Sequence, residues 1–326
     1  MKIENLRPFN GQHCETTTTG TLLQQIGIEL SEPMLFGLGE GLSFIYWNMK
    51  TMDFPFIGGR IKPDFLTQNI AKNLNLELTV KETSSQQKAW EQVKELLDSG
   101  QAVGLKMDCY HLEYFSNPFH FAGHYAAIYG YDDENAYLAD TRQQGSQVQT
   151  SLKSLAMARA EKGPMASKNL YYTLRKTNRK YDLEKAIITA IKSNTAEYLN
   201  PPITNVSYKG ILKTSTEIVK WFNMSKDIET EFKQAALLME KAGTGGALFR
   251  NLYRDFLKES YELLRLDPLK AGYEAFREIA ELWTNVSQLF EKVSQTKDIQ
   301  YIHQATDILK EISDKEKRTM EILTTL

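Results

Sequence analysis

Cysteine is scarce in this sequence, since Cys14 and Cys109 are the two thiols in 326 residues. Disulfide frameworks are typical of small secreted domains that are rich in cysteine, so that class of protein is excluded. The first residues, from Met1 to Glu4, also lack the basic and then apolar pattern of a secretory leader. We therefore predict a reducing, cytoplasmic setting in which both thiols are free.

Long apolar runs and an excess of one charge are missing as well. No apolar run approaches the roughly 18 residues that span a bilayer, and the formal net charge is -2. A chain without a broad basic field has little long-range attraction for nucleic acid or for an anionic membrane. We therefore expect no nucleic-acid partner and no membrane partner.

The two halves of the chain differ in their sequence patterns, and the length of the chain fits about two domains. Residues 1–176 mix short strand-like runs, turns and helices, and they hold both cysteines and four of the five histidines. The basic, polar stretch 175–180 leads into a half with a helical pattern throughout. We predict an α+β domain at 1–176 and an all-helical domain at 177–326.

Turn and helix signals place the elements of the first domain. A helix is expected at 16–26, and the strands 124–131 and 136–140 are joined by the polar stretch 132–135, which is typical of a hairpin. The other predicted elements are strands at 42–47, 76–81, 102–107 and 170–174 and helices that begin after Asp64 and at Ser85. Helices followed by antiparallel strands indicate an α+β fold.

The second domain shows amphipathic helical spacing. One face of its first helix carries Leu183, Ala186, Ile187, Ala190 and Ile191. Further helices are predicted at 211–222, 228–239, 247–264, 273–290 and 299–312. We expect their aromatic side chains in a helical core rather than around a cofactor, and we predict no cofactor.

A short stretch near the N-terminus carries the first sign of chemistry. Cys14 follows a turn that contains Gly11 and directly precedes the predicted helix. The free N–H groups at a helix N-terminus favour an anion, and thiols at such positions ionise more readily. The stretch alone leaves two interpretations open, a reactive thiolate or a buried cysteine that acts as a small hydrophobic residue.

A histidine and an acid lie at the ends of the predicted hairpin. His124 begins its first strand and Asp140 ends its second, so the acid can accept one ring N–H while the other ring nitrogen faces a nucleophile. Each residue alone also fits an ordinary structural role, but Cys14, His124 and Asp140 together predict a catalytic triad. The Cys14 amide is the expected oxyanion donor, with the side chain of Gln12 or Asn10 as a second candidate.

Two other kinds of site were considered. Zinc would accept the set Cys109, His111, His120 and His124, but the spacing matches no standard zinc pattern, and we predict no metal. The glycines 243–246 lack the Lys-Ser/Thr of a nucleotide loop. Asp108 and Tyr110, after a buried strand, and Arg250, after the glycine turn, are the remaining candidates for substrate contacts.

Three stretches carry a resemblance to a known family. Phe9–Cys14, Leu30–Gly39 and Gly123–Asp140 resemble the N-terminal domain of the butirosin biosynthesis protein H acyltransferases, and Gly245–Leu257 resembles the uncharacterised C-terminal domain often found with it. The resemblance implies a fold like that of papain-like cysteine peptidases, especially the bacteriocin leader peptidases. It also implies transfer of an acyl group from a carrier-protein thioester to an amine in secondary metabolism.

Carried over to this sequence, the resemblance makes Cys14 the acyl-accepting nucleophile, His124 its base and Asp140 the orienting acid. One departure concerns the oxyanion donor, because papain-like enzymes place a glutamine several residues before the cysteine and Gln12 stands two before it. The implied partners are an acyl carrier protein as donor and a small-molecule or peptide amine as acceptor. The same triad also serves peptidases and amidases, and a non-catalytic binding protein is a further alternative.

Overall fold

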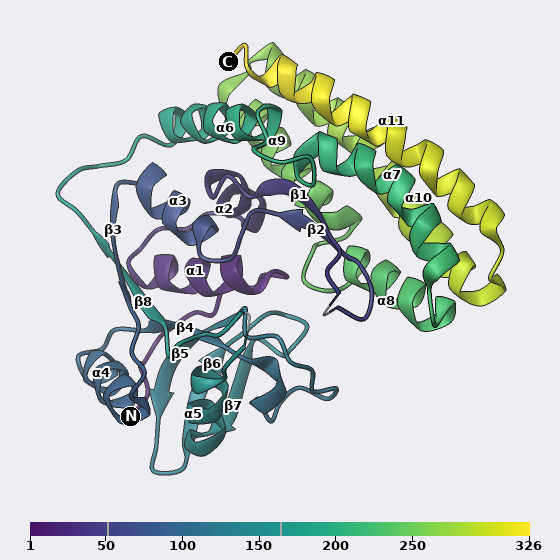
Figure 1. Ribbon diagram of the computed structural model, residues 1–326. Helices are drawn as coiled ribbons and strands as arrows, with labels where there is room; N and C mark the ends of the chain where they lie inside the picture. The colour runs from purple at the N-terminus through teal and green to yellow at the C-terminus, as the bar shows by residue number, and fades with distance from the viewer. Residues whose placement is uncertain (51, 164) are drawn as a thin grey trace. The chain divides into compact units, whose positions relative to one another are not determined.

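The computed structural model describes residues 1–50, 52–163 and 165–326 and divides into two compact units, which Figure 1 shows in one ribbon. The first, here the α+β unit, contains Met1–Leu35 and Pro63–Tyr181. The second, here the helical unit, contains Phe36–Lys62 and Asp182–Leu326. This arrangement confirms the predicted fold class, an α+β region followed by an all-helical region.

One segment departs from the predicted division into 1–176 and 177–326. Residues 36–62 belong with the C-terminal helices because their hairpin buries apolar side chains there. The ring of Phe44, for example, stacks on Trp283 with 5.6 Å between ring centroids. The sequence does not show this association, because the two residues are far apart along the chain.

A six-stranded sheet forms the centre of the α+β unit, with strand order β3-β8-β4-β5-β6-β7 and antiparallel neighbours. Its strands are β3 (Leu76–Lys81), β4 (Val103–Met107), β5 (His124–Tyr131), β6 (Asn135–Ala139), β7 (Gln147–Ser151) and β8 (Tyr171–Lys176). The predicted hairpin is β5–β6, whose register pairs Ala127 with Ala139. The short polar turn determines this pairing locally.

Helices cover both faces of the sheet. The helices of the unit are α1 (Cys14–Gln25), α2 (Glu32–Leu38, which continues into the helical unit), α3 (Phe65–Asn73), α4 (Gln86–Asp98) and α5 (Leu152–Ala160). Figure 1 shows α1 on one side of the sheet and α4 and α5 on the other. The second face carries the apolar core, where Leu97 and Leu155 pack with Leu105 and Ile128.

The central helix α1 is unusual because it is buried yet rich in threonine. Thr16 to Thr19 are all inaccessible to solvent, as is Thr21. Buried hydroxyls need partners, and Thr19 Oγ1 lies 2.9 Å from both Thr67 Oγ1 and the Tyr172 hydroxyl. Such hydrogen bonds fix the rotation of α1 on the sheet, and therefore the position of the residue at its N-terminus.

The helical unit contains a two-stranded sheet and six α-helices within the described residues. The strands are β1 (Leu42–Trp47) and β2 (Phe56–Arg60), and the helices are α6 (Leu183–Leu199), α7 (Ser207–Met224), α8 (Ile228–Glu240), α9 (Arg250–Leu264), α10 (Asp267–Thr296) and α11 (Ile299–Leu323). Each predicted helix of this half is present, and α10 and α11 are longer than their apolar patterns indicated. Asp182 caps α6 as an acceptor for the Lys185 amide.

A buried ion pair lies in the middle of the helical unit. Arg250 Nε donates to Glu316 Oε1 at 2.8 Å and Nη2 donates to Oε2 at 3.0 Å, with both side chains inaccessible to solvent. Trp283 Nε1 donates to the same carboxylate at 2.9 Å, as does the Tyr198 hydroxyl. Arg250 Nη1 also donates to the carbonyl of Leu248. Paired and hydrogen-bonded on both sides, the two charges are compatible with burial.

Replacing Arg250 by methionine is expected to destabilise the protein strongly, because Glu316 would remain as a buried charge without its partner. Breaking a buried pair in this way costs about 3–5 kcal/mol. Urea unfolding of Arg250→Met and wild type measures the difference in the free energy of unfolding. Arg277→Met, at an exposed position of α10, is the matched control and should change it by less than about 0.5 kcal/mol. A loss below about 1 kcal/mol for Arg250→Met would contradict the structural role of the pair.

Candidate active site

The structure places Cys14 at the first position of α1. His13, before it, has extended backbone torsions of φ -91 and ψ 130, and its carbonyl accepts the amide of Thr17 at 2.9 Å to begin the helix. The Cys14 side chain is partly exposed rather than buried. A thiol at this position faces the unpaired N–H groups of a helix N-terminus and has access to solvent, as a nucleophile requires.

A carboxylate that the sequence analysis did not single out holds the turn before Cys14. The Glu32 side chain is only 8% exposed. Its carboxylate accepts hydrogen bonds from the backbone amides of Gln12, at 2.9 Å, and His13, at 2.8 Å. The Thr16 hydroxyl donates to the same carboxylate at 2.8 Å. Glu32 opens α2, so the sequence pattern indicated only a helix start there. Three hydrogen bonds to one buried carboxylate make this turn rigid.

The amide of Cys14 stays the predicted donor to a substrate oxygen. Among the described residues it has no acceptor, because Glu32 takes the two preceding amides and the helix offers none to its first residue. The Gln12 side chain is partly exposed and that of Asn10 is exposed, and neither makes a hydrogen bond within the described part of the chain. Both stay predictions for the second oxyanion donor.

His124 and Asp140 are in direct contact, in the geometry that the hairpin predicts. His124 is the first residue of β5, and Asp140 directly follows β6. The distance from His124 Nε2 to Asp140 Oδ2 is 2.7 Å, and the two side chains are nearly or fully inaccessible to solvent. Because Asp140 occupies Nε2, the other ring nitrogen, Nδ1, is left to face a thiol.

The electrostatics favour a protonated imidazole. Burial is the largest single influence and lowers the pKa of His124, but the charges of Asp140 and Cys109 and the hydrogen bonds to both together outweigh it and hold the pKa well above its ordinary value. A histidine that is readily protonated can stabilise a neighbouring thiolate as an ion pair. The His124–Asp140 pair therefore provides a readily protonated imidazole in the α+β unit.

The turn of the nucleophile and the loop of the acid are joined directly. The Arg142 amide, two residues after Asp140, donates to the Gly11 carbonyl, three residues before Cys14, at 2.9 Å. Gly11 also lets this turn pack closely on α1, since a Cβ there would lie 2.3 Å from the Thr17 hydroxyl oxygen. This hydrogen bond couples the position of Cys14 to that of Asp140.

A second thiol lies beside the same histidine. Cys109 follows β4, which pairs with β5 so that Met107 lies opposite His124. It is 1% exposed, and burial raises the pKa of the Cys109 thiol, while His124 partly offsets this effect. Cys14 also lies close enough to act on Cys109 electrostatically. Cys109 at the end of β4 is thus the thiol that interacts with His124, and Cys14 at the start of α1 lies near Cys109.

Three predicted substrate contacts have other roles in the structure. Asp108 is 2% exposed and accepts the Tyr110 amide at 2.8 Å, so it caps the short 3-10 helix Cys109–His111. Tyr110 is 47% exposed and its ring stacks on His120 at 4.0 Å. The prediction for Arg250 is wrong, because its donors are taken by Glu316 and by carbonyl groups. Its partner is 66 residues away in the sequence, which no local pattern shows.

Neither a metal cluster nor a membrane span is found in the part of the chain that the structure describes. Within residues 1–50, 52–163 and 165–326, no three His, Cys, Asp or Glu side chains lie together so as to hold a metal ion. The histidines of the zinc alternative have separate partners, since His111 Nε2 lies 2.5 Å from Glu161 and His124 pairs with Asp140. Over the same described ranges, no helix has the length and apolarity to cross a membrane.

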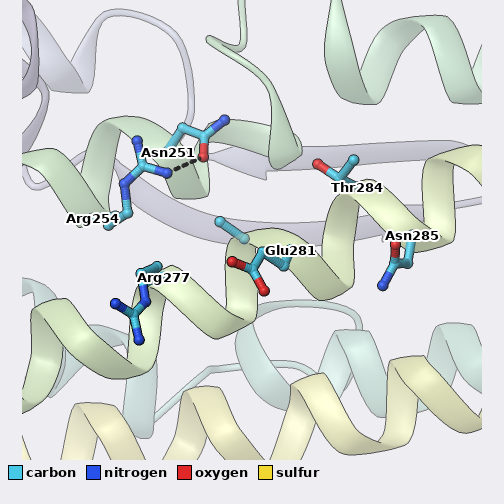
Figure 2. Close-up of a pocket in the computed structure, with 7 residues that line it drawn as sticks. Asn251, Arg254, Arg277, Glu281, Thr284 and Asn285 are labelled. Atoms are coloured by element: carbon cyan, nitrogen blue, oxygen red, sulfur yellow. Dashed lines mark hydrogen bonds between the residues drawn. The ribbon is translucent and has the colours of Figure 1, made fainter.

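The helical unit has a shallow pocket of its own, about 200 Å³ in volume, between α9 and α10 (Figure 2). It is lined by Asn251, Arg254, Arg277, Ala280, Glu281, Thr284 and Asn285. The lining contains no thiol or imidazole. Arg254 is held in place, because Nε and Nη2 donate to the Asp255 carboxylate and Nη1 donates to Asn251. This pocket is therefore separate from the His124–Asp140 pair, which lies in the α+β unit.

Removing the Glu32 carboxylate is expected to loosen the turn before Cys14. Glu32→Ala leaves the amides of Gln12 and His13 without their acceptor, which costs about 1–3 kcal/mol. Urea unfolding measures this loss, and Glu29→Ala, at an exposed position of the same connection, is the matched control. If Glu32→Ala and Glu29→Ala had the same free energy of unfolding, Glu32 would not hold the turn.

The His124–Asp140 contact is expected to stabilise the fold in a pH-dependent way. The folded pKa of His124 is raised, so the contribution is fully present below the unfolded pKa of about 6.5 and is lost as the pH rises through the folded pKa. The difference in unfolding free energy between wild type and Asp140→Asn should therefore shrink on going from pH 6 to high pH. An equal difference at every pH above 6 would contradict the ion pair.

Two families match this chain. Residues 13–141 match Butirosin biosynthesis protein H, N-terminal, a range that contains Cys14, His124 and Asp140. Residues 153–323 match Domain of unknown function (DUF4872). Comparison with curated proteins finds no match. Since the second match spans more than half of the 326 residues, the chain belongs to the DUF4872 family and carries a butirosin biosynthesis protein H N-terminal domain, as the resemblance predicted.

Proposed function

We propose that this protein is a cysteine-dependent acyltransferase in which Cys14 is the nucleophile, His124 the base and Asp140 the orienting acid. The observation that carries the proposal is the 2.7 Å contact between His124 Nε2 and Asp140. Because Nε2 contacts Asp140, the other ring nitrogen of His124, Nδ1, remains for the proposed nucleophile. That nucleophile, Cys14, begins the helix α1, which packs on the sheet. The family match adds support, because its name places a relative of this domain in butirosin biosynthesis.

The proposed reaction has two steps. In the first, the Cys14 thiolate attacks the carbonyl carbon of a thioester, and the carbonyl oxygen accepts a hydrogen bond from the Cys14 amide. The departing thiolate takes the proton from His124. In the second, an amine attacks the acyl-enzyme, His124 accepts the proton of the amine, and the Cys14 thiolate leaves. Asp140 keeps the imidazole in one tautomer and orientation throughout.

The donor and acceptor follow from the chemistry of a thiol nucleophile. A thioester exchanges with a thiolate at little cost because both sides of the reaction are thioesters, so an acyl group on a carrier protein is the proposed donor. The proposed acceptor is a small-molecule or peptide amine of secondary metabolism. A working thiolate must stay reduced, which agrees with the expected cytoplasmic setting.

Hydrolysis is the second candidate, and the exposure of Cys14 favours it. A partly exposed thiol carries an acyl group that water can reach, so the same triad would act as a peptidase or amidase. The two functions share the acyl-enzyme and differ only in what attacks it. The experiment must therefore follow the fate of the acyl group.

Incubation with a short acyl thioester is expected to add one acyl group to the intact mass. The adduct should form on wild type and on Cys109→Ala, but not on Cys14→Ala, because the buried Cys109 has a raised pKa. Adding an amine should then release an amide faster than water releases the acid. A rate of acyl release that is independent of the amine would favour the hydrolase. An adduct that still forms on Cys14→Ala would contradict the assignment of Cys14 as the nucleophile.

A further inference from the structure

The buried carboxylate of Asp140 has three hydrogen-bond donors, and two of them, the Thr141 amide and the Tyr114 hydroxyl, are outside the triad. The Thr141 amide donates to Oδ1 at 2.6 Å, while His124 Nε2 lies 2.7 Å from Oδ2. The Tyr114 hydroxyl donates to the same Oδ2, also at 2.7 Å. Two donors on one oxygen define a fixed angle between them, so Tyr114 constrains where His124 can lie.

Tyr114 is well placed to hold this geometry. It lies in the connection between β4 and β5, next to Phe115, whose ring packs edge-on against the His124 imidazole with 5.3 Å between centroids. One residue earlier, Glu113 accepts the Ser151 amide at 2.7 Å and the Ser151 hydroxyl at 2.9 Å. The connection is thus tied to the end of β7 on one side and to the triad on the other.

The hydroxyl of Tyr114 remains a donor over the whole working range of pH. Burial raises the pKa of Tyr114, and the charge of Asp140 raises it further, well above the ordinary value for tyrosine. A donor to a carboxylate withdraws part of its negative charge. Tyr114 therefore has two effects on the imidazole, since it fixes the Asp140 carboxylate and it weakens the pull of that carboxylate on the ring proton.

We propose that Tyr114 is a positioning residue, which holds Asp140 so that His124 directs Nδ1 at the nucleophilic thiol. The inference rests on the proposed function, since it assigns a role within the same triad. It extends the site to a fourth member, in the order Tyr114, Asp140, His124 and Cys14. Tyr114 touches no substrate in this scheme and acts on His124 through Asp140.

The test uses Tyr114→Phe, which removes the hydroxyl and keeps the ring. We expect the alkylation of Cys14 by iodoacetamide at neutral pH to slow by about tenfold, the value of one hydrogen bond to a charged group. We also expect the pKa of His124, followed by NMR titration of its ring, to rise, because Asp140 then acts on the imidazole alone. Incorporation of 3-fluorotyrosine at position 114 strengthens the donor, keeps the fold and should shift that pKa in the opposite direction.

The matched control is Tyr131→Phe, because the Tyr131 hydroxyl donates to Asp98 at 2.6 Å in the same unit but away from the triad. It should leave both readouts unchanged. If Tyr114→Phe matched wild type in both, or Tyr131→Phe changed them equally, the positioning role would be overturned and the proposed function would stand. If wild-type Cys14 reacted no faster than in His124→Ala, the proposed function itself would fail.

Discussion

The buried charge of Asp140 is the constraint on which the candidate site depends. A carboxylate without solvent is tolerated only when donors surround it, and here the donors are Thr141, Tyr114 and His124. Each comes from a different segment, so satisfying one carboxylate requires the hairpin, the loop after β4 and the turn after β6 to meet. That turn then reaches the Gly11 carbonyl through the Arg142 amide. The position of the nucleophile is thereby linked to the position of the acid.

Each unit contains a buried acidic side chain with a full set of donors, but only one of the two networks can do chemistry. In the helical unit, Glu316 accepts from Arg250 and Trp283, neither of which exchanges a proton near neutral pH. In the α+β unit, Asp140 accepts from His124, whose proton can move, and the Cys109 thiol lies beside the imidazole. A buried carboxylate surrounded by donors therefore stabilises the fold in the helical unit, and in the α+β unit it favours the protonated form of His124.

The sequence predicts what is local and misses what is long-range. The stretch 132–135 is a turn signal, so the β5–β6 hairpin and the pairing of His124 with Asp140 could be read from residues close together. Tyr114 and Glu32 carry no such signal, because a tyrosine in a loop and a glutamate at a helix start are ordinary until their partners are known. Arg250 was misread for the same reason, since its partner is distant in the sequence. The association of residues 36–62 with the C-terminal helices is likewise long-range.

Burial distinguishes the two thiols of the α+β unit. Cys109 interacts with His124 directly, but its burial raises its pKa and keeps it neutral, and a neutral thiol is a poor nucleophile. Cys14 is partly exposed at a helix N-terminus, where Glu32 takes the preceding amides and leaves that of Cys14 for an oxyanion. A substrate carbonyl can reach Cys14 from solvent and find a donor there, whereas Cys109 offers neither. Of the two thiols, Cys14 is therefore the one that a substrate can approach from solvent.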